Sequence, residues 1–536
     1  MTEPSATDPP VVDSQNCLGK LQTTSRRRTR RSRSRKTPSR PNEHLEVPFI
    51  TRNIPTYDLL SEESLVTIEQ AADTILADIG IEFRDDPETV RLFEAAGGRV
   101  RKLNDNASNI TFEPGMIRQI LATAPARFTQ HARNPLHSVE IGGDAVVLAP
   151  AYGSPFVMEL GQPRRYGTLE DFENFVKLAQ SSPWLHHSGG TICEPTDVPV
   201  NKRHLDMVYA HMRYSDRAFL GSITAPVRAA DSIEMCRILF GAEFVDKHCV
   251  IMGNFNSTSP LIWDGIATRG IRTYAKAGQG SILLPFLLGG AVSPVTTAGS
   301  VAQGLAESMV GCALTQLVRP GAPAVLASFF STTSLRSGSP TFGTPESSLA
   351  SLAMGQLARR LKLPLRCAGN FSTSKLPDGQ AMTQAVMSML SAVQGGANYI
   401  LHSAGFLDGL LSMSYEKFML DTDLCGALHT YMNGIVVNED TLGIDALHEG
   451  GPGEHLFGSA HTLAHYKTAY WESALNDDRP YETWAEQGSE DAMTRANRLW
   501  KKTLAEYQPP PLDEAVDEQL KDFVARQKAS TKDAWY

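Results

Sequence analysis

From about residue 144, the chain alternates short apolar runs with longer amphipathic segments, and this alternation sets the strongest limit on its fold. The eight runs are 145–150, 184–190, 217–224, 249–256, 281–290, 322–330, 364–372 and 397–405. Helical segments are predicted to begin near Thr168, Pro199, Ala229, Pro260, Thr296, Thr344, Asp378 and Ser414. Continuous apolar strands that alternate with helices are typical of parallel strands buried on both faces. Eight such units close a (β/α)8 TIM barrel, which is the predicted α/β fold.

An open, doubly wound sheet is the alternative fold. That fold usually carries a glycine-rich phosphate-binding turn after its first strand. The corresponding segment here, 149–156 (APAYGSPF), has no GxGxxG pattern, and the chain has no GxxxxGK[ST] motif. The sequence therefore favours the barrel and gives no support to nucleotide binding.

The regions around the barrel differ in composition. We expect a disordered basic arm at 1–45, an N-terminal helical or mixed cap at 46–143, the barrel at 144–433 and a C-terminal helical extension at 434–536. Within the cap, helices are predicted at 61–76, 86–96 and 114–124. Residues 1–40 contain ten Lys and Arg against three Asp and Glu. Such a block either stays solvated or docks on an acidic partner or RNA.

The charge and cysteine counts exclude several classes of protein. The 536 residues include 50 Lys and Arg against 59 Asp and Glu, and a formal charge of −9 argues against a protein that coats nucleic acid. No run approaches the ~18 apolar residues of a membrane span, and the N-terminus lacks the apolar segment of a secretion signal. Seven scattered cysteines without a CxxC pair are typical of reduced thiols. We therefore expect a cytoplasmic protein.

In a (β/α)8 barrel, function resides in the loops after the C-terminal ends of the strands. Here those loops are rich in aromatic and amide side chains and poor in charge. The predicted substrate-binding residues are Tyr152, Asn254, Phe255, Asn256, Phe329, Phe330, Asn370, Lys375 and Gln380. Aromatic faces bind a quaternary ammonium group by cation–π attraction, and asparagine amides can hold a carboxylate or hydroxyl at the other end of a substrate. In the alternative interpretation, the phenylalanines simply fill the top of the barrel.

Phe371, Glu346 and His402 are the candidates for a catalytic role. Glu346 begins a predicted helix, where the helix dipole alone would also favour a carboxylate. His402 lies in the eighth apolar run, and a purely structural histidine is the alternative there. Lys375 follows the seventh run; it either forms a Schiff base with a carbonyl substrate or an ion pair with Asp378.

The histidines do not predict a metal centre. His186 and His187 are adjacent, and the group His455, His461 and His465 lacks a recognisable zinc-ligand spacing. His461 and His465 are four residues apart and share a helix face, but the sequence shows no third ligand beside them. No metal is therefore predicted.

Several longer strings occur in order along the chain. They are ILADIGIEF (75–83), HARNP (131–135), GGAVSPVTTAGSVAQGLAE (289–307), QLVRPGAPAV (316–325), GTPESSLASLAMGQLARRLKLP (343–364), STSKLPDGQA (372–381), SYEKFMLD (414–421) and GGPGEHL (450–456). Together they resemble the trimethylamine methyltransferase family over roughly residues 50–505.

The resemblance implies a (β/α)8 barrel that transfers a methyl group from a methylated amine to the Co(I) of a separate corrinoid protein. It implies no cofactor bound directly by this chain. Archaeal trimethylamine enzymes of the family carry pyrrolysine, and the equivalent position falls within 369–375 (GNFSTSK), where this chain has ordinary residues. Phe371 or a close neighbour then stands in its place. The chain is thus similar to the non-pyrrolysine branch, which includes glycine betaine:corrinoid methyltransferases.

This difference limits the expected substrate. Methyl transfer is an SN2 attack by Co(I) on an N–CH3 carbon, and a quaternary ammonium already leaves as a neutral amine. Such a substrate requires orientation and desolvation rather than a general acid. The resemblance therefore implies that the substrate is a quaternary amine such as glycine betaine. Carnitine, choline and proline betaine are the expected alternatives behind it. A corrinoid protein is the expected partner, and a homo-oligomer is also an expectation, because barrels of this size often pair.

Two other functional classes remain open at this point. One is a Schiff-base lyase or aldolase that uses Lys375, for which borohydride would trap the substrate on the lysine. The other is a non-catalytic role, either as a betaine-binding protein or as an RNA-associated scaffold that uses the basic arm. That role predicts binding without turnover.

Overall fold

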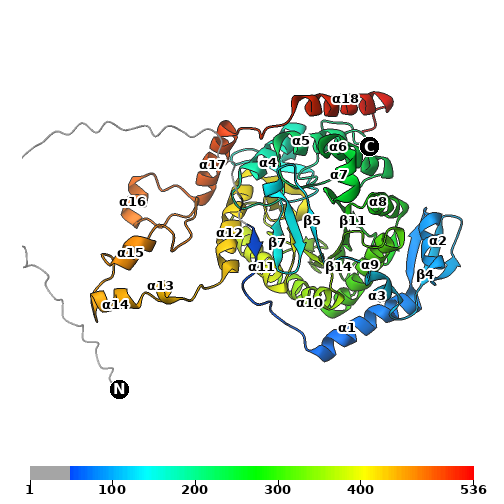
Figure 1. The fold of residues 1–536 in the computed structure, drawn as a ribbon, viewed down its shortest axis with the longest axis horizontal. Coiled ribbons are helices and arrows are strands. Elements are labelled where there is room, and N and C mark those ends of the chain that lie inside the picture. Colours follow the sequence, from blue (N-terminus) through cyan, green and yellow to red (C-terminus); the bar gives the residue numbers. More distant parts are fainter. Residues whose placement is uncertain (1–46, 48, 536) are drawn as a thin grey trace, which may run out of the picture. The chain divides into compact units, whose positions relative to one another are not determined.

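The computed structural model describes residues 47 and 49–535, so the basic arm predicted at 1–45 lies outside the described residues. The described residues belong to one compact unit (Figure 1). Among the helices of the described residues, none is both long and apolar enough to cross a membrane.

The main sheet contains seven parallel strands in the order β10-β11-β13-β15-β18-β19-β7. These strands are β7 (Ala145–Leu148), β10 (Phe219–Leu220), β11 (Ile251–Asn256), β13 (Gly280–Leu284), β15 (Ala324–Ala327), β18 (Leu365–Ala368) and β19 (Tyr399–Leu401). All seven lie within predicted apolar runs or within one residue of them. Their residues are almost entirely buried, as expected for strands covered on both faces.

The remaining predicted strand, 184–190, is not a regular strand, but its backbone lies between β10 and β7, which begin and end the series of seven parallel strands. The His186 N–H donates to the Leu148 carbonyl (3.0 Å), and the Ser188 N–H donates to the Ala218 carbonyl (2.9 Å). The Leu220 N–H in turn donates to the Gly189 carbonyl (2.8 Å). The sheet therefore curls into a TIM-barrel-like α/β fold.

All eight predicted helices are present and surround this sheet (Figure 1). They are α4 (Leu169–Ser181), α5 (Arg203–Tyr214), α6 (Pro226–Phe240), α8 (Gly265–Lys276), α9 (Thr297–Val318), α10 (Pro345–Leu361), α11 (Gly379–Gly395) and α12 (Tyr415–Asn433), with a short α7 (Ala242–Lys247) after α6. Local signals fix where several of them begin. Thr168 forms a capping box with Asp171, and the Asp378 side chain accepts the Ala381 N–H.

The N-terminal region contains the three predicted helices, α1 (Glu62–Thr74), α2 (Pro87–Ala95) and α3 (Met116–Leu121), all of which contact α9. A small antiparallel sheet of β2 (Ile81–Arg84), β4 (Ala107–Thr111) and β3 (Arg99–Lys102) lies among them and pairs with β12 (Ile262–Trp263). Two further strands, β5 (Arg127–Gln130) and β6 (Val139–Gly142), extend the main sheet instead, and β1 (Ile50–Thr51) pairs with β7.

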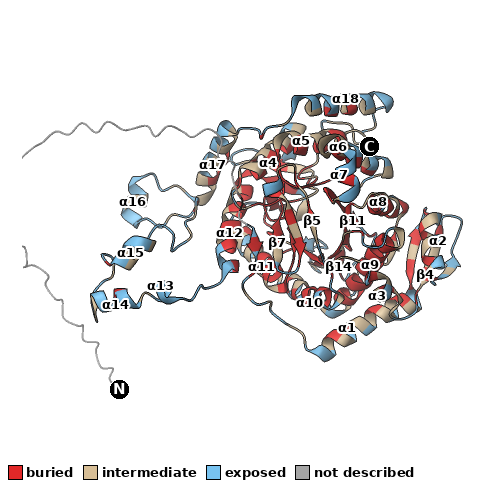
Figure 2. Cartoon of the chain, viewed as in Figure 1, coloured by how far each residue is buried: buried red, intermediate tan, exposed pale blue. Residues whose placement is uncertain are grey.

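After α12, the chain is helical but unevenly packed. The helices are α13 (Glu439–Leu442), α14 (Ile444–Gly450), α15 (Ala460–His465), α16 (Tyr481–Glu486), α17 (Ala492–Glu506) and α18 (Glu514–Ser530). Helix α17 packs on α12 and α4, and α18 packs on α5 and α6. Residues 434–490, which we call the exposed segment, are mostly open to solvent (Figure 2).

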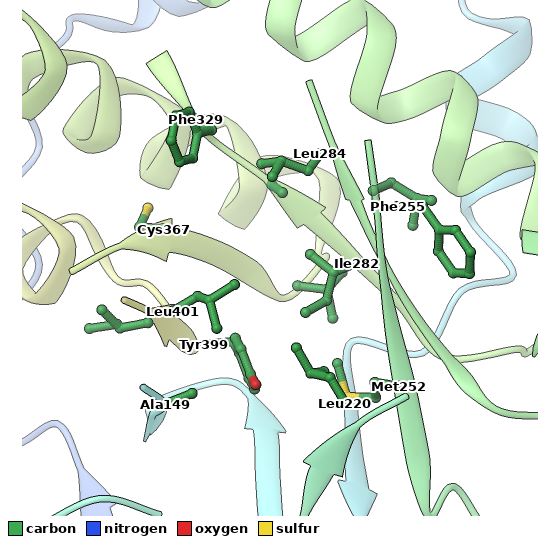
Figure 3. Packing of buried hydrophobic residues seen from close by; sticks show 14 of the residues in the cluster. Ala149, Leu220, Met252, Phe255, Ile282, Leu284, Phe329, Cys367, Tyr399 and Leu401 are labelled. Carbon is green, nitrogen blue, oxygen red and sulfur yellow. The ribbon is translucent and has the colours of Figure 1, made fainter. Parts of the chain in front are cut away.

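The interior of the barrel is filled by side chains from its strands. Leu220, Met252, Ile282 and Tyr399 come from four strands and lie close together, with Phe329 further along the barrel (Figure 3). The loops that follow these strands are therefore anchored on a packed, buried interior.

Candidate functional site

A cluster of aromatic rings lies at the C-terminal ends of three neighbouring strands. Phe329 follows β15, Phe371 follows β18, and His402 and Phe406 follow β19. The Phe371 ring centre is 5.0 Å from Phe329, 4.9 Å from His402 and 4.9 Å from Phe406. Phe342 adds a fifth ring, 5.2 Å from Phe371. We call these five residues the ring cluster; all of them are buried.

His402 holds the cluster to the strand ends through an unusual backbone conformation. Its φ is +65°, in the left-handed region that residues other than glycine rarely adopt. The His402 carbonyl accepts the Asn370 N–H (2.8 Å), and the ring Nδ1 accepts the Tyr152 N–H (3.2 Å). This second bond leaves the ring proton on Nε2. Burial, and the nearby positive charge of Arg366, hold the pKa of His402 well below its usual range, so the ring is neutral at pH 7.

Arg366 of β18 lies beside the ring cluster as a buried cation. Its guanidinium carbon is 5.3 Å from the centre of the Phe329 ring, and Nη1 donates to the Ser328 carbonyl (3.3 Å). Nε and Nη2 are buried and have no hydrogen-bond partner among the described residues, and no carboxylate there forms an ion pair with Arg366. Burial lowers the pKa of Arg366 to about 10, so the group still carries its charge at pH 7. A buried charge without an ion-pair partner is costly, and a bound anion would offset that cost.

Asn370 contributes a second unsatisfied group. Its Nδ2 donates to the Ser403 carbonyl (2.6 Å), which fixes the amide, while the buried Oδ1 has no partner among the described residues. An amide oxygen is an acceptor, and it can contact the polarised methyl groups of a quaternary ammonium. A polar ligand or an ordered water at this end of the barrel would satisfy the unpartnered atoms of both Arg366 and Asn370.

The structure brings together some of the predicted site residues. Phe329, Asn370, Phe371 and His402 meet at this point, and the Tyr152 main chain is bonded to His402. Burial raises the pKa of the Tyr152 hydroxyl to about 12, so this phenol stays neutral. Asn254 is buried in β11, and its Oδ1 has no partner among the described residues.

Other predicted residues lie outside the ring cluster. The Phe255 side chain points away from its strand, β11, and toward α8 (Figure 3). Its ring centre is 5.4 Å from that of Tyr274. The ring fits there because residues 253 and 270 are glycines; a Cβ at either would lie 2.6 Å from it. Phe330 packs against Gly289. Asn256, Glu346 and Gln380 are exposed, and Glu346 occupies the first turn of α10, where a helix dipole suffices to explain it.

Lys375 is also exposed, with 71% of its side chain open to solvent. The expected ion pair with Asp378 is wrong, because Asp378 accepts the Ala381 N–H (3.0 Å) and the Ser374 hydroxyl (2.9 Å) at the start of α11. Lys375 instead lies 3.4 Å from Asp408 and donates to the Thr373 carbonyl. Schiff-base lysines are usually activated by desolvation, and the position of Lys375 provides none.

Sequence reasoning missed Arg366 and Phe342. The signal for Arg366 was present, because side chains alternate between the two faces of a strand. Residues 366, 368 and 370 therefore share one face of 364–372, and an arginine inside such an apolar run is rarely buried without a reason. Phe342 gave no such signal, since it lies in the loop between β17 (Pro340–Thr341) and α10.

Comparisons with known proteins identify the family to which the chain is similar. The family model for trimethylamine methyltransferase matches residues 25–532. A glycine betaine methyltransferase from Desulfitobacterium hafniense is 38% identical over 474 residues, covering 88% of this chain and 98% of that protein. The trimethylamine methyltransferase MttB of Methanosarcina barkeri is 26% identical over 482 residues, covering 87% and 94%. The crystal structure of the Methanosarcina barkeri monomethylamine methyltransferase (MtmB) gives a TM-score of 0.49 at 10% identity, covering 87% and 91%.

The family match spans nearly all of the described chain, and the 38% identical relative is covered almost in full. Both are methyltransferases by name, as are the more distant relatives. The chain belongs to the trimethylamine methyltransferase family and is a methyltransferase.

Proposed function

We propose that the protein demethylates a quaternary amine that also carries a carboxylate, such as glycine betaine, and passes the methyl group to the Co(I) of a separate corrinoid protein. The observation that carries this proposal is the unpaired guanidinium of Arg366 beside the ring cluster. In glycine betaine and proline betaine, one carbon atom separates the positive nitrogen from the carboxylate, so the carboxylate meets Arg366 while the ammonium faces Phe371 and the neutral His402.

The proposed reaction is one nucleophilic displacement. The Co(I) electron pair forms the new bond to a methyl carbon, and the C–N bond breaks with its electron pair left on nitrogen. The products are methyl-Co(III) and a neutral tertiary amine, which for glycine betaine is dimethylglycine. No proton moves, so the site needs no general acid. The chain contributes binding of the two ends of the substrate and exclusion of water from the buried cluster.

The neutral state of His402 supports a cationic substrate. An imidazolium at this position would repel a quaternary ammonium, and burial beside Arg366 prevents that charge from forming near pH 7. Arg366 itself would repel an ammonium that brought no carboxylate. The site therefore selects for the zwitterion and against amines such as choline or trimethylamine.

We also infer that the barrel is a complete (β/α)8 barrel in which 184–190 supplies the eighth position between β7 and β10. The backbone hydrogen bonds of His186 to β7, and of Ser188 and Gly189 to residues 218 and 220, support this. The corrinoid would then approach the C-terminal ends of the strands, where the ring cluster lies. A cytoplasmic location, a homo-oligomer and the lack of a directly bound cofactor remain predictions.

The reaction can be tested with purified protein and reduced cob(I)alamin, using glycine betaine, carnitine, choline, proline betaine and trimethylamine in turn. The absorbance change from Co(I) to methyl-Co(III) reports transfer. We expect transfer from a betaine and none from trimethylamine. Transfer from choline or trimethylamine but not from any carboxylated amine would contradict the proposal, as would product formation without methylated cobalt.

Replacement of Phe371 by alanine is expected to weaken binding of the quaternary ammonium by roughly 1–2 kcal/mol, about 5–30-fold, because one cation–π face is lost. Isothermal titration of glycine betaine into the variant measures this directly. Phe255→Leu is the matched control, since Phe255 packs against α8 rather than the cluster. Equal affinities of Phe371→Ala and wild type would remove Phe371 from the binding site.

A further inference from the structure

The exposed segment 434–490 holds a group of metal-ligating side chains that is remote from the ring cluster in sequence. Asp440 in α13, together with His461 and His465 in α15, places one ligand atom each within 4.8 Å of the others. The sequence shows the two histidines one helical turn apart, but the third ligand comes from a helix that lies 21 residues earlier. We propose that Asp440, His461 and His465 bind a Zn²⁺ ion that fastens α13 to α15.

The three side chains already converge in the structure. His465 Nε2 lies 3.1 Å from Asp440 Oδ1, and His461 Nε2 lies 2.9 Å from the Asp440 carbonyl oxygen. The two imidazole rings are 4.6 Å apart. Tetrahedral zinc holds its nitrogen and oxygen ligands at ~2.0–2.1 Å, which places them roughly 3.3 Å from one another. Asp440 is exposed and both histidines are half-buried, so small side-chain rotations are enough to close the remaining distance.

The backbone around the three ligands is fixed by local caps. The Asn438 side chain accepts the Thr441 N–H (2.8 Å) at the start of α13, and the Ser459 hydroxyl accepts the Thr462 N–H (3.1 Å) at the start of α15. Gly443 has φ +57°, and a Cβ there would lie 3.2 Å from the His461 ring. The glycine thus lets the histidine approach the end of α13 closely, so the ligands are presented by ordered turns.

The segment has little else to hold it together. Among residues 434–490, only Ala446, Ser459 and Leu475 are buried, and α13 to α16 are mostly pale blue in Figure 2. Small units without a hydrophobic core commonly depend on a metal or a disulfide, and the described cysteines are all elsewhere.

Charge and ligand type both favour a divalent ion of the zinc class. The segment contains eleven Asp and Glu against two Lys and Arg, which gives a formal charge of −9 and raises the local concentration of cations. Two imidazoles and one carboxylate suit Zn²⁺ and its first-row neighbours, whereas Mg²⁺ and Ca²⁺ prefer oxygen ligands only. The fourth position of a tetrahedral ion would be taken by water.

The test uses untagged full-length protein that has been dialysed against a chelator. Titration with Zn²⁺ is followed by calorimetry, and titration with Co²⁺ by the visible absorption of tetrahedral cobalt. We expect one equivalent to bind, with the affinity reduced at least 10-fold in both His465→Gln and Asp440→Asn. His455→Gln is the matched control, because His455 is an exposed histidine of the same segment outside the ligand set, and it should bind as wild type does.

A second measurement reports the effect on structure. Limited proteolysis of the segment should slow several-fold when Zn²⁺ is added to the wild type, with no change in His465→Gln. The proposal is overturned if the wild type takes up no zinc, if His465→Gln binds it as tightly as the wild type, or if zinc protects both proteins equally. Methyl transfer is not used as a readout, so failure here is independent of the proposed reaction.

Discussion

Replacement of Arg366 by methionine is expected to lower kcat/KM for glycine betaine by about 100-fold or more. A hydrogen-bonded charge pair in a buried site contributes on the order of 2–5 kcal/mol, and the substrate carboxylate would lose that partner. Methionine has a similar length and fills the same apolar space, so the ring cluster stays packed. The loss should appear mainly in transfer from carboxylated amines.

The same variant should gain activity toward choline. Without the guanidinium, a substrate that brings only a positive nitrogen no longer meets a second cation near Phe329. The ratio of kcat/KM for glycine betaine to kcat/KM for choline is then expected to fall by a larger factor than either value changes by itself. This double effect separates an anchoring role from general damage to the site, which would lower both rates.

Stability gives a second independent signature of that role. Arg366 is fully buried, and two of its guanidinium nitrogens have no partner among the described residues, so removing the charge relieves a desolvation cost. We expect Arg366→Met to melt at the same temperature as the wild type or higher. The exposed Arg336→Met serves as control for both assays. A variant that unfolds more easily, or that keeps full activity on glycine betaine, would show that Arg366 is structural.

The sequence predicts the scaffold better than the site, and the reason is physical. Strands such as 249–256 are recognisable because burial on both faces demands a continuous apolar run, and helix starts such as Thr168 are fixed by local capping. Phe255 shows the limit of this reasoning. Its position near a strand end suggested the pocket, but strand alternation and the glycines at 253 and 270 turn the ring outward.

The predicted site residues that the structure brings together share one property. Phe371 and His402 immediately follow strands β18 and β19, so the barrel topology alone brings them together. Lys375 and Gln380 lie a few residues further on, where the loop has already reached the surface. Phe342 reaches the ring cluster from the loop after β17, and no local sequence pattern predicts such a long-range contact. The sequence alone can therefore predict the location of a loop residue only when that residue lies close to the end of a strand.

Acidification from pH 7 to pH 4 is expected to unfold most of the protein because of its buried histidines. Burial lowers the pKa of His211 and His429 to about 4, and it holds those of His187 and His402 well below the usual value. In the unfolded chain these groups take up protons near pH 6.5, before the native protein does. The unfolded state therefore binds more protons, and the free energy of unfolding falls as the pH drops below about 6.5.

The magnitudes favour this outcome. Each of His211 and His429 shifts by about 2.5 units, and at 1.36 kcal/mol per unit this corresponds to roughly 3 kcal/mol per histidine at pH 4. Asp421 acts in the opposite direction, because burial raises its pKa to about 6 and the native state then binds a proton first. Burial also raises the pKa of Asp73, Glu194 and Asp423, whereas the lowered pKa values of Asp171 and Asp216 add to the loss of stability in acid. The net loss is comparable to the 5–15 kcal/mol that stabilises a typical domain.

Urea unfolding followed at pH 7 and pH 4.5 measures this loss, and His429→Gln assigns part of it. His429 Nε2 donates to the Trp184 carbonyl (3.0 Å), a bond that a glutamine amide can replace without a titrating group. The variant is expected to lose about 2–3 kcal/mol less than the wild type on acidification, whereas His455→Gln, at an exposed position, should follow the wild type. If both variants and the wild type lose the same free energy of unfolding, buried histidines do not cause the acid sensitivity. Protonation of the carboxylates that form ion pairs must then cause it.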